Sequence, residues 1–267
     1  MIKLISGLIK HASQNMTNKI AKVAYRFGSE FGIHHHMWNS WRYIHELAGF
    51  NRELKTNQGD FIFPKYSIPS EEYLTPEIKV LNDLIENTRS NDVFYDIGAD
   101  SGLYTVPVGS VCNTIAFEPH PVRRATLRRV LKRNRVSATV RTEALSNEKR
   151  TAKFGYRIAA DSKDNSDFTA QLVPGDELVG ELPQPTVLKI DVEGAEQDVL
   201  SGLDDTIKSK DCRLIYVELH DRISDYGGSW EGLKEHLTSS GFEIETIAIR
   251  SEDNVTQPYI KASKIVE

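Results

Sequence analysis

Short apolar segments alternate with segments of helical periodicity along most of this chain. The apolar segments lie at residues 93–97, 114–117, 139–145, 186–192 and 214–219. Segments with apolar side chains every three or four positions lie between or beside them, at residues 76–88, 122–134, 195–208 and 230–239. Strands that are apolar along their whole length belong to sheets covered on both faces, and the intervening helices supply that cover. The pattern therefore predicts an α/β fold with a doubly wound, mostly parallel sheet.

The two ends of the chain depart from this alternation. Two strands near residues 242–249 and 258–262 are expected to close the sheet as an antiparallel pair. Residues 1–70 are expected to form an extension that is mainly helical, with a short strand at 61–63. We therefore divide the chain into an extension, 1–70, and a main domain, 71–267, in which 153–158 adds a strand to the sheet.

Composition narrows the class of protein. Hydrophobic residues make up 39% and charged residues 27% of the 267 residues, and the net charge is −5, as in an ordinary globular protein. This acidic balance disfavours a dedicated nucleic-acid-binding protein. Only two cysteines occur, Cys112 and Cys212, both at expected strand starts. We therefore expect no disulfide framework and a cytoplasmic location.

Two basic segments stand out against this balance. The first 57 residues hold eight lysines and arginines against three acids, and apolar side chains near helical spacing begin at Ile2. Such a helix suits peripheral contact with the inner membrane surface, or it packs over the main domain. The predicted helix at 122–134 is basic as well, which suits RNA or a solvated outer face with Val122, Ala125, Leu127 and Val130 turned inward. We prefer the solvated face, and we interpret His34–His36 as surface residues, because adjacent histidines point in different directions.

The strand at 93–97 leads into a glycine-containing turn. Its motif comprises Asp96, Gly98, Ala99, Asp100 and Gly102. The glycines allow a tight turn close to a ligand. A dinucleotide site would instead use Gly-x-Gly-x-x-Gly, with a pyrophosphate that these aspartates would repel. The carboxylates favour a cofactor with a positive centre and an ammonium group.

The next two strands end in residues that suit a nucleoside. Glu118 follows the glycine turn by about twenty residues, where an acid can accept hydrogen bonds from both ribose hydroxyls. Ala144 ends the third strand, where it would border an adenine. Alternatively, the glycines only make a tight turn and Glu118 only caps a helix.

Charged residues at the ends of two further strands are candidates for the chemistry. Strand alternation places Lys189, Asp191 and Glu193 on one face, and Glu218 and His220 are also two residues apart. Buried charges are costly unless they are paired or used. We interpret His220 as a general base, because imidazole titrates near neutral pH, with Glu218 or Asp191 orienting it. Alternatively, the three acids and His220 hold Mg²⁺ or Mn²⁺, although Lys189 could neutralise a carboxylate instead.

These motifs resemble those of the FkbM family of methyltransferases. The similar segments, spread over roughly residues 91–242, are Asp-Ile-Gly-Ala at 96–99, Phe-Glu-Pro at 117–119, Lys-Ile-Asp-Val-Glu-Gly-Ala-Glu at 189–196 and Glu-Leu-His at 218–220. The resemblance implies a Rossmann-like methyltransferase domain at 71–267, S-adenosylmethionine as cofactor, and O-methylation of a sugar, a glycan or a small metabolite.

The resemblance also assigns positions. Asp96, Gly98, Gly102 and Glu118 match cofactor positions of the family, and Asp191, Glu193, Glu218 and His220 match its charged positions. This chain departs from the family after Ala99, where it has Asp-Ser-Gly-Leu instead of Asn-Ile-Gly-Tyr, and Pro107 should shorten the helix that follows. A nicotinamide-dependent oxidoreductase, an RNA methyltransferase and a non-catalytic binding module are the alternatives. The sequence leaves the acceptor and the oligomeric state open.

Overall fold

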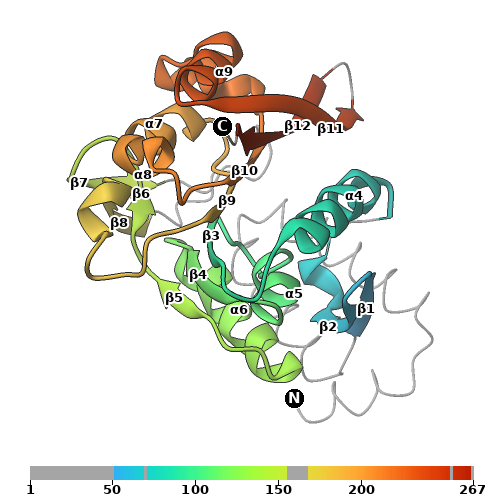
Figure 1. Cartoon of the computed structure of the whole chain (residues 1–267). Coiled ribbons are helices and arrows are strands. Elements are labelled where there is room, and N and C mark those ends of the chain that lie inside the picture. The colour runs from blue at the N-terminus through green and yellow to red at the C-terminus, as the bar shows by residue number, and fades with distance from the viewer. Residues whose placement is uncertain (1–50, 69–70, 155–167, 253–254, 266–267) are drawn as a thin grey trace, which may run out of the picture.

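A computed structural model describes residues 51–68, 71–154, 168–252 and 255–265 (Figure 1). Its centre is a seven-stranded sheet in the order β11-β12-β10-β9-β3-β4-β5. The parallel strands are β3 (Val93–Ile97), β4 (Asn113–Phe117), β5 (Thr139–Arg141), β9 (Val187–Ile190) and β10 (Leu214–Glu218). β12 (Val255–Lys264) runs antiparallel to both β10 and β11 (Phe242–Glu252). The predicted mostly parallel α/β sheet with an antiparallel C-terminal strand is confirmed.

Successive side chains of a strand point to opposite faces of the sheet. Both faces are apolar here, and helices cover both of them. Phe94 faces a core shared with α4 (Glu71–Asn87), α5 (Thr105–Gly109) and α6 (Pro121–Asn134). Tyr95 faces the opposite core, which includes the helices α7 (Glu196–Ser201), α8 (Asp204–Lys208) and α9 (Trp230–Ser239). Figure 1 shows α4 and α5 on one side of the central strands and α7 and α8 on the other.

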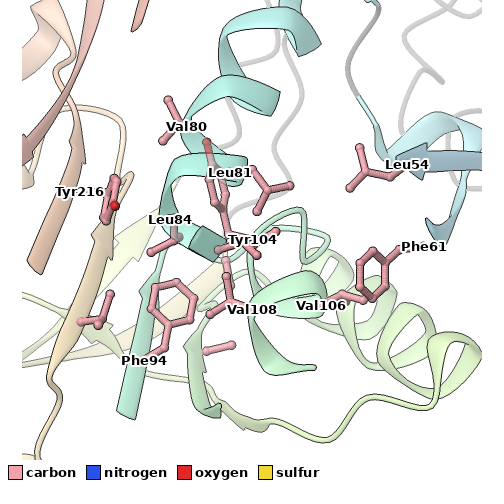
Figure 2. Close-up of a cluster of buried hydrophobic side chains, with 14 of the residues drawn as sticks. Leu54, Phe61, Val80, Leu81, Leu84, Phe94, Tyr104, Val106, Val108 and Tyr216 are labelled. Carbon is pink, nitrogen blue, oxygen red and sulfur yellow. The ribbon is translucent and has the colours of Figure 1, made fainter. Parts of the chain in front are cut away.

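The described part of the extension is a hairpin of β1 (Asn51–Thr56) and β2 (Gly59–Pro64). Leu54 points from it toward α4 and Phe61 points toward Val106 of α5 (Figure 2), and both are buried in the same core as these helices. The Asn134 side chain bonds the backbone of Ile62 and ties the hairpin to α6. The predicted strand at 61–63 lies in β2. The predicted N-terminal helix and His34–His36 lie outside the described residues.

Several predicted elements are divided or shifted. The strand predicted at 139–145 ends at Arg141, where Glu143 accepts a hydrogen bond from the amide of Thr142. β6 (Ala144–Leu145) then joins β8 (Phe168–Val173) and β7 (Arg150–Phe154) in a separate three-stranded sheet. The helix predicted at 195–208 breaks at Gly202, where a Cβ would meet the backbone oxygen of Ser146 at 1.9 Å.

The helices α4 and α5 each contain a proline. The helix that we predicted from residue 76 begins earlier, at Glu71, and contains Pro76 in its second turn. α5 is only five residues long and contains Pro107, as predicted. Both cysteines are buried and free. No helix of the described part of the chain has the length and apolar character needed to span a bilayer.

Candidate functional site

The carboxyl ends of β3, β4, β9 and β10 bring the predicted charged and glycine residues to one edge of the sheet. Neighbouring parallel strands end together, and ligands of open α/β sheets bind beyond such ends. Asp96 lies opposite Lys189 in the β3–β9 register, and Lys189 lies opposite Tyr216 in the β9–β10 register. The site therefore has two parts. One is the glycine turn, residues 98–102, and the other is a charged cluster of Lys189, Asp191, Glu218 and His220.

The glycine turn is held by the end of β4. The amides of Gly98 and Ala99 both donate to the backbone oxygen of Phe117, at 3.0 and 3.1 Å. The amide of Asp100 donates to Oε2 of Glu118 at 2.8 Å. Asp100 adopts a φ of 45° and Gly98 a φ of 86°, which explains why small or short polar residues occupy this turn. Hydrogen bonds within the protein thus fix the conformation of this turn.

The two glycines of this turn pack against protein. A Cβ on Gly98 would lie 1.8 Å from the backbone oxygen of Asp191, and a Cβ on Gly102 would lie 2.6 Å from Cδ1 of Leu127. We predicted that the glycines allow a close approach to a ligand; on the side of its missing Cβ, Gly98 instead approaches the end of β9. Glycine therefore brings the turn and the charged cluster within direct contact of each other.

Glu118 is buried beneath the turn, with 4% of its surface exposed. Its two oxygens accept the amides of Asp100 and His120, at 2.8 and 2.7 Å. Burial, together with the charge of Asp100, raises the pKa of Glu118 to about 7. Each carboxylate oxygen has a second lone pair, which is the one that a ribose hydroxyl would need. The prediction of a ribose-binding acid is compatible with this geometry and stays a prediction.

Asp96 is buried more deeply than expected, and Ala144 lies in a different sheet from the other candidate residues. Asp96 is 2% exposed and accepts a hydrogen bond from the Thr105 hydroxyl, because strand alternation turns it toward α5. Burial raises the pKa of Asp96 to about 6. Only Asp100 is exposed, and it pairs with Arg123 at 3.2 Å. Of the two aspartates that we expected to favour a cationic cofactor, Asp100 is therefore exposed and Asp96 is buried, while Ala144 lies in the separate small sheet.

A buried lysine and a partly buried arginine pair with the carboxylates at the ends of β9 and β10. Nζ of Lys189, which is fully buried, lies 3.3 Å from Oδ2 of Asp191. Nη1 of Arg250 donates to Oε1 of Glu218 at 2.7 Å. Burial and the charge of Asp191 raise the pKa of Glu218 to about 8. Burial alone would raise the pKa of Asp191, but the charges of Lys189 and His220 outweigh it and lower that pKa. The carboxylates of this cluster are therefore largely neutralised.

His220 points its two ring nitrogens at different partners. Nδ1 lies 2.7 Å from Oε1 of Glu196, whereas Nε2 lies 3.7 Å from Glu218, 3.8 Å from Asp191 and 3.9 Å from Glu193. We had predicted Glu218 or Asp191 as its orienting partner, and the structure places Glu196 there. Burial would lower the pKa of His220, but the Glu196 hydrogen bond and the nearby carboxylates raise it to about 9. The pKa of His220 therefore lies above the near-neutral range that we expected from the sequence.

A divalent cation could be held by Asp191, Glu218 and His220, whose candidate ligand atoms lie within 4.8 Å of one another. Glu193 is outside this group. β9 ends at Ile190, so strand alternation does not continue to Glu193, which has a φ of 60° and a 63% exposed side chain. An incoming ion would have to compete with the cations that already pair with both carboxylates.

Sequence reasoning missed a second layer of the cluster. Glu77 on α4 is buried and bonds to Arg250 and to the hydroxyls of Tyr104 and Tyr259. Arg250 thus bridges Glu77 and Glu218. These residues lie up to 182 positions apart in the chain, and no local motif marks them.

The basic helix α6 agrees in most respects with the predicted solvated outer face. Leu127 and Val130 are buried as predicted, whereas Ala125 is exposed and Thr126 takes an inward position. Its exposed basic residues are Arg128, Arg129, Lys132, Arg133 and Arg135. The Arg124 side chain instead donates to the backbone oxygen of Glu118, so the first turns of α6 support the glycine turn.

Comparison with known proteins identifies relatives of this chain. The hexuronic acid methyltransferase AglP of Haloferax volcanii is 31% identical over 154 residues, which cover 55% of this chain and 64% of the relative, just under two thirds. Methyltransferase 1 of Beauveria bassiana is 25% identical over 185 residues, covering 56% of this chain and 71% of the relative. The crystal structure of the FkbM methyltransferase from Methylobacillus flagellatus is 15% identical, with a TM-score of 0.48, and the match covers 74% of this chain and 56% of that one.

At the level of the family, the sequence model of the methyltransferase FkbM domain matches residues 92–244 of this chain. The match includes the glycine turn, Glu118 and the charged ends of β9 and β10. Because it spans more than half of the 267 residues, the chain belongs to the FkbM methyltransferase family.

Proposed function

We propose that this protein transfers a methyl group from S-adenosylmethionine to an oxygen atom of a sugar, glycan or small metabolite. The observation that carries the proposal is the placement of Nε2 of His220 among Asp191, Glu193 and Glu218, at the edge where the glycine turn contacts Asp191. The family membership supports methyl transfer, and the relative named hexuronic acid methyltransferase supports a sugar acceptor.

The residues suit each need of a methyl transfer. Glu118 would bind the ribose, and Asp100 is the exposed acid of the turn. The bound cofactor supplies a methyl group on a sulfonium, and holding it in line with the acceptor oxygen can contribute about 7–11 kcal/mol. Nε2 of His220 would accept the proton of the acceptor hydroxyl as the methyl group leaves sulfur and joins oxygen. Such base catalysis typically contributes ~10²–10⁴-fold.

His220 can accept this proton only after losing the one it holds at neutral pH. A nearby sulfonium charge favours the neutral imidazole, because like charges disfavour protonation. The same position could instead ligate a divalent cation with Asp191 and Glu218, and the cation would lower the pKa of the acceptor hydroxyl. We favour the metal-free mechanism, because Lys189 and Arg250 already pair with these two carboxylates.

Methyl transfer can be measured directly. The full chain is incubated with isotopically labelled S-adenosylmethionine and with uronic-acid oligosaccharides, neutral oligosaccharides or RNA. We expect label on sugar oxygen, and mild alkali separates labile methyl esters from stable methyl ethers. Label on RNA alone would contradict the sugar acceptor. Calorimetry that detects NAD binding but no S-adenosylhomocysteine binding would overturn the assignment of the cofactor.

A further inference from the structure

A buried carboxylate contacts the ring of His220 on the side away from Asp191 and Glu218. Glu196, the first residue of α7, has no exposed surface. Its Oε1 lies 2.7 Å from Nδ1 of His220 and also accepts the amide of Gly194 at 2.9 Å. Its Oε2 is buried and has no hydrogen-bond partner among the residues that the structure describes. The two contacts of Oε1 are therefore what offset the burial of this carboxylate.

This contact decides which ring nitrogen is available for chemistry. A neutral imidazole has one nitrogen that donates and one that accepts, whereas an ionised carboxylate only accepts. The proton of neutral His220 must therefore lie on Nδ1, toward Glu196, and the lone pair on Nε2, toward Asp191 and Glu218. The backbone is held as well, because the Trp230 indole donates to the carbonyl of His220 at 2.9 Å. Both the tautomer and the direction of the ring are thus set by its surroundings.

We propose that Glu196 is a positioning residue that fixes the tautomer and the orientation of His220, so that Nε2 faces the acceptor oxygen. This inference rests on the proposed role of His220 as the base. Glu196 acts through His220 and does not itself face the acceptor. The Lys-Ile-Asp-Val-Glu-Gly-Ala-Glu segment therefore ends in a residue with a distinct task.

A purely structural role for Glu196 makes different predictions. Its bond to Gly194 could simply stabilise the turn that precedes α7, and its loss would then lower stability without changing the chemistry of folded protein. Two substitutions separate these roles. Glu196→Gln keeps the shape and an amide oxygen that can accept from both Gly194 and Nδ1, so it preserves the tautomer. Glu196→Ala removes the acceptor altogether.

The first measurement is turnover of the full chain with a sugar acceptor. We expect Glu196→Ala to lower kcat by about 10²-fold, within the range for loss of a general base, with the KM for the acceptor and the affinity for S-adenosylhomocysteine unchanged within about twofold. Glu196→Gln should retain more activity than Glu196→Ala. The double variant with His220→Ala should be no slower than His220→Ala alone, because both changes disable one unit.

The second measurement reads the tautomer without any turnover. Nitrogen-15 shifts of His220 in labelled protein, followed up to a pH above 9 where the imidazole is neutral, should then report Nδ1–H in the wild type and in Glu196→Gln, and loss of that preference in Glu196→Ala. Asp92→Asn is a matched control, since Asp92 is a buried carboxylate that pairs with Arg213 and lies before β3, at the opposite end of that strand. It should lower stability and leave the shifts of His220 unchanged.

The outcomes distinguish this inference from the proposed function. Wild-type kcat and an unchanged tautomer in folded Glu196→Ala would overturn the positioning role, even if His220→Ala is inactive. Wild-type kcat in His220→Ala would instead refute the base itself. If Glu196→Ala does not fold, the comparison passes to Glu196→Gln, in which a changed tautomer would contradict the inference.

Discussion

Replacing Gly98 by alanine should uncouple the glycine turn from the charged cluster. The new Cβ would lie 1.8 Å from the backbone oxygen of Asp191, so the two strand ends must separate by more than about 1 Å to reach an ordinary contact distance. The φ of 86° adds about 1–2 kcal/mol of backbone strain for a residue with a side chain. Overpacking against backbone costs typically another ~1–3 kcal/mol. Together we expect a loss of about 2–5 kcal/mol in the free energy of unfolding.

Gly227→Ala provides the control for strain alone. Gly227 has a similar φ of 78°, and its Cβ would have nothing within 4 Å. Urea denaturation of both variants should show a cost of only about 1–2 kcal/mol at Gly227. Folded Gly98→Ala should also bind S-adenosylhomocysteine more weakly in calorimetry. Equal losses of stability in the two variants would show that the contact with Asp191 is not tight, and would refute the reasoning.

Three further predictions concern charge. Glu118 has a pKa near 7, above its ordinary value, and ribose hydroxyls prefer the ionised carboxylate. Calorimetric affinity for S-adenosylhomocysteine should therefore rise with pH up to about 7 and fall by up to ~10-fold per unit below it, whereas Glu118→Gln should show a flat profile. Lys189→Met leaves the carboxylate of Asp191 without its cation and should cost about 3–5 kcal/mol in urea denaturation, against ~1 kcal/mol or less for the exposed Lys149→Met. EDTA should leave turnover unchanged, because both carboxylates of the cluster have cationic partners; a loss restored by Mg²⁺ or Mn²⁺ would refute the metal-free mechanism.

The central sheet could be predicted because its physical cause is local. Strands that are covered on both faces must be apolar along their length, and β3, β4, β9 and β10 are buried at nearly every position. β8 was missed, because only half of its positions are buried and it lies after a polar segment. The break between α7 and α8 was missed for another reason: Leu203, which lies between them, leaves the helical conformation, and the close contact of Gly202 with the Ser146 backbone is a long-range feature that no periodicity encodes.

The candidate site was predicted as a set of positions but not as a set of partners. Motif spacing placed Asp191, Glu218 and His220 at neighbouring strand ends, and the structure brings their side chains within 4.8 Å. The orienting partner of His220 was assigned wrongly, because strand alternation cannot show that the turn after β9 brings Glu196 beneath the ring. The pKa values could not be predicted either, since they depend on burial and on charges from separate strands.

The chain of ion pairs that begins at Glu218 shows why the family domain alone does not account for this site. The family match covers residues 92–244, yet Glu218 pairs with Arg250, and Arg250 pairs in turn with Glu77. Both partners lie outside the match, one on α4 and one on β11. A buried carboxylate at this position carries a large desolvation cost unless a cation and further hydrogen bonds offset it. The segments on either side of the family domain therefore stabilise the charged end of β10, and differences there between relatives would alter the electrostatics of the site without any change in the shared motifs.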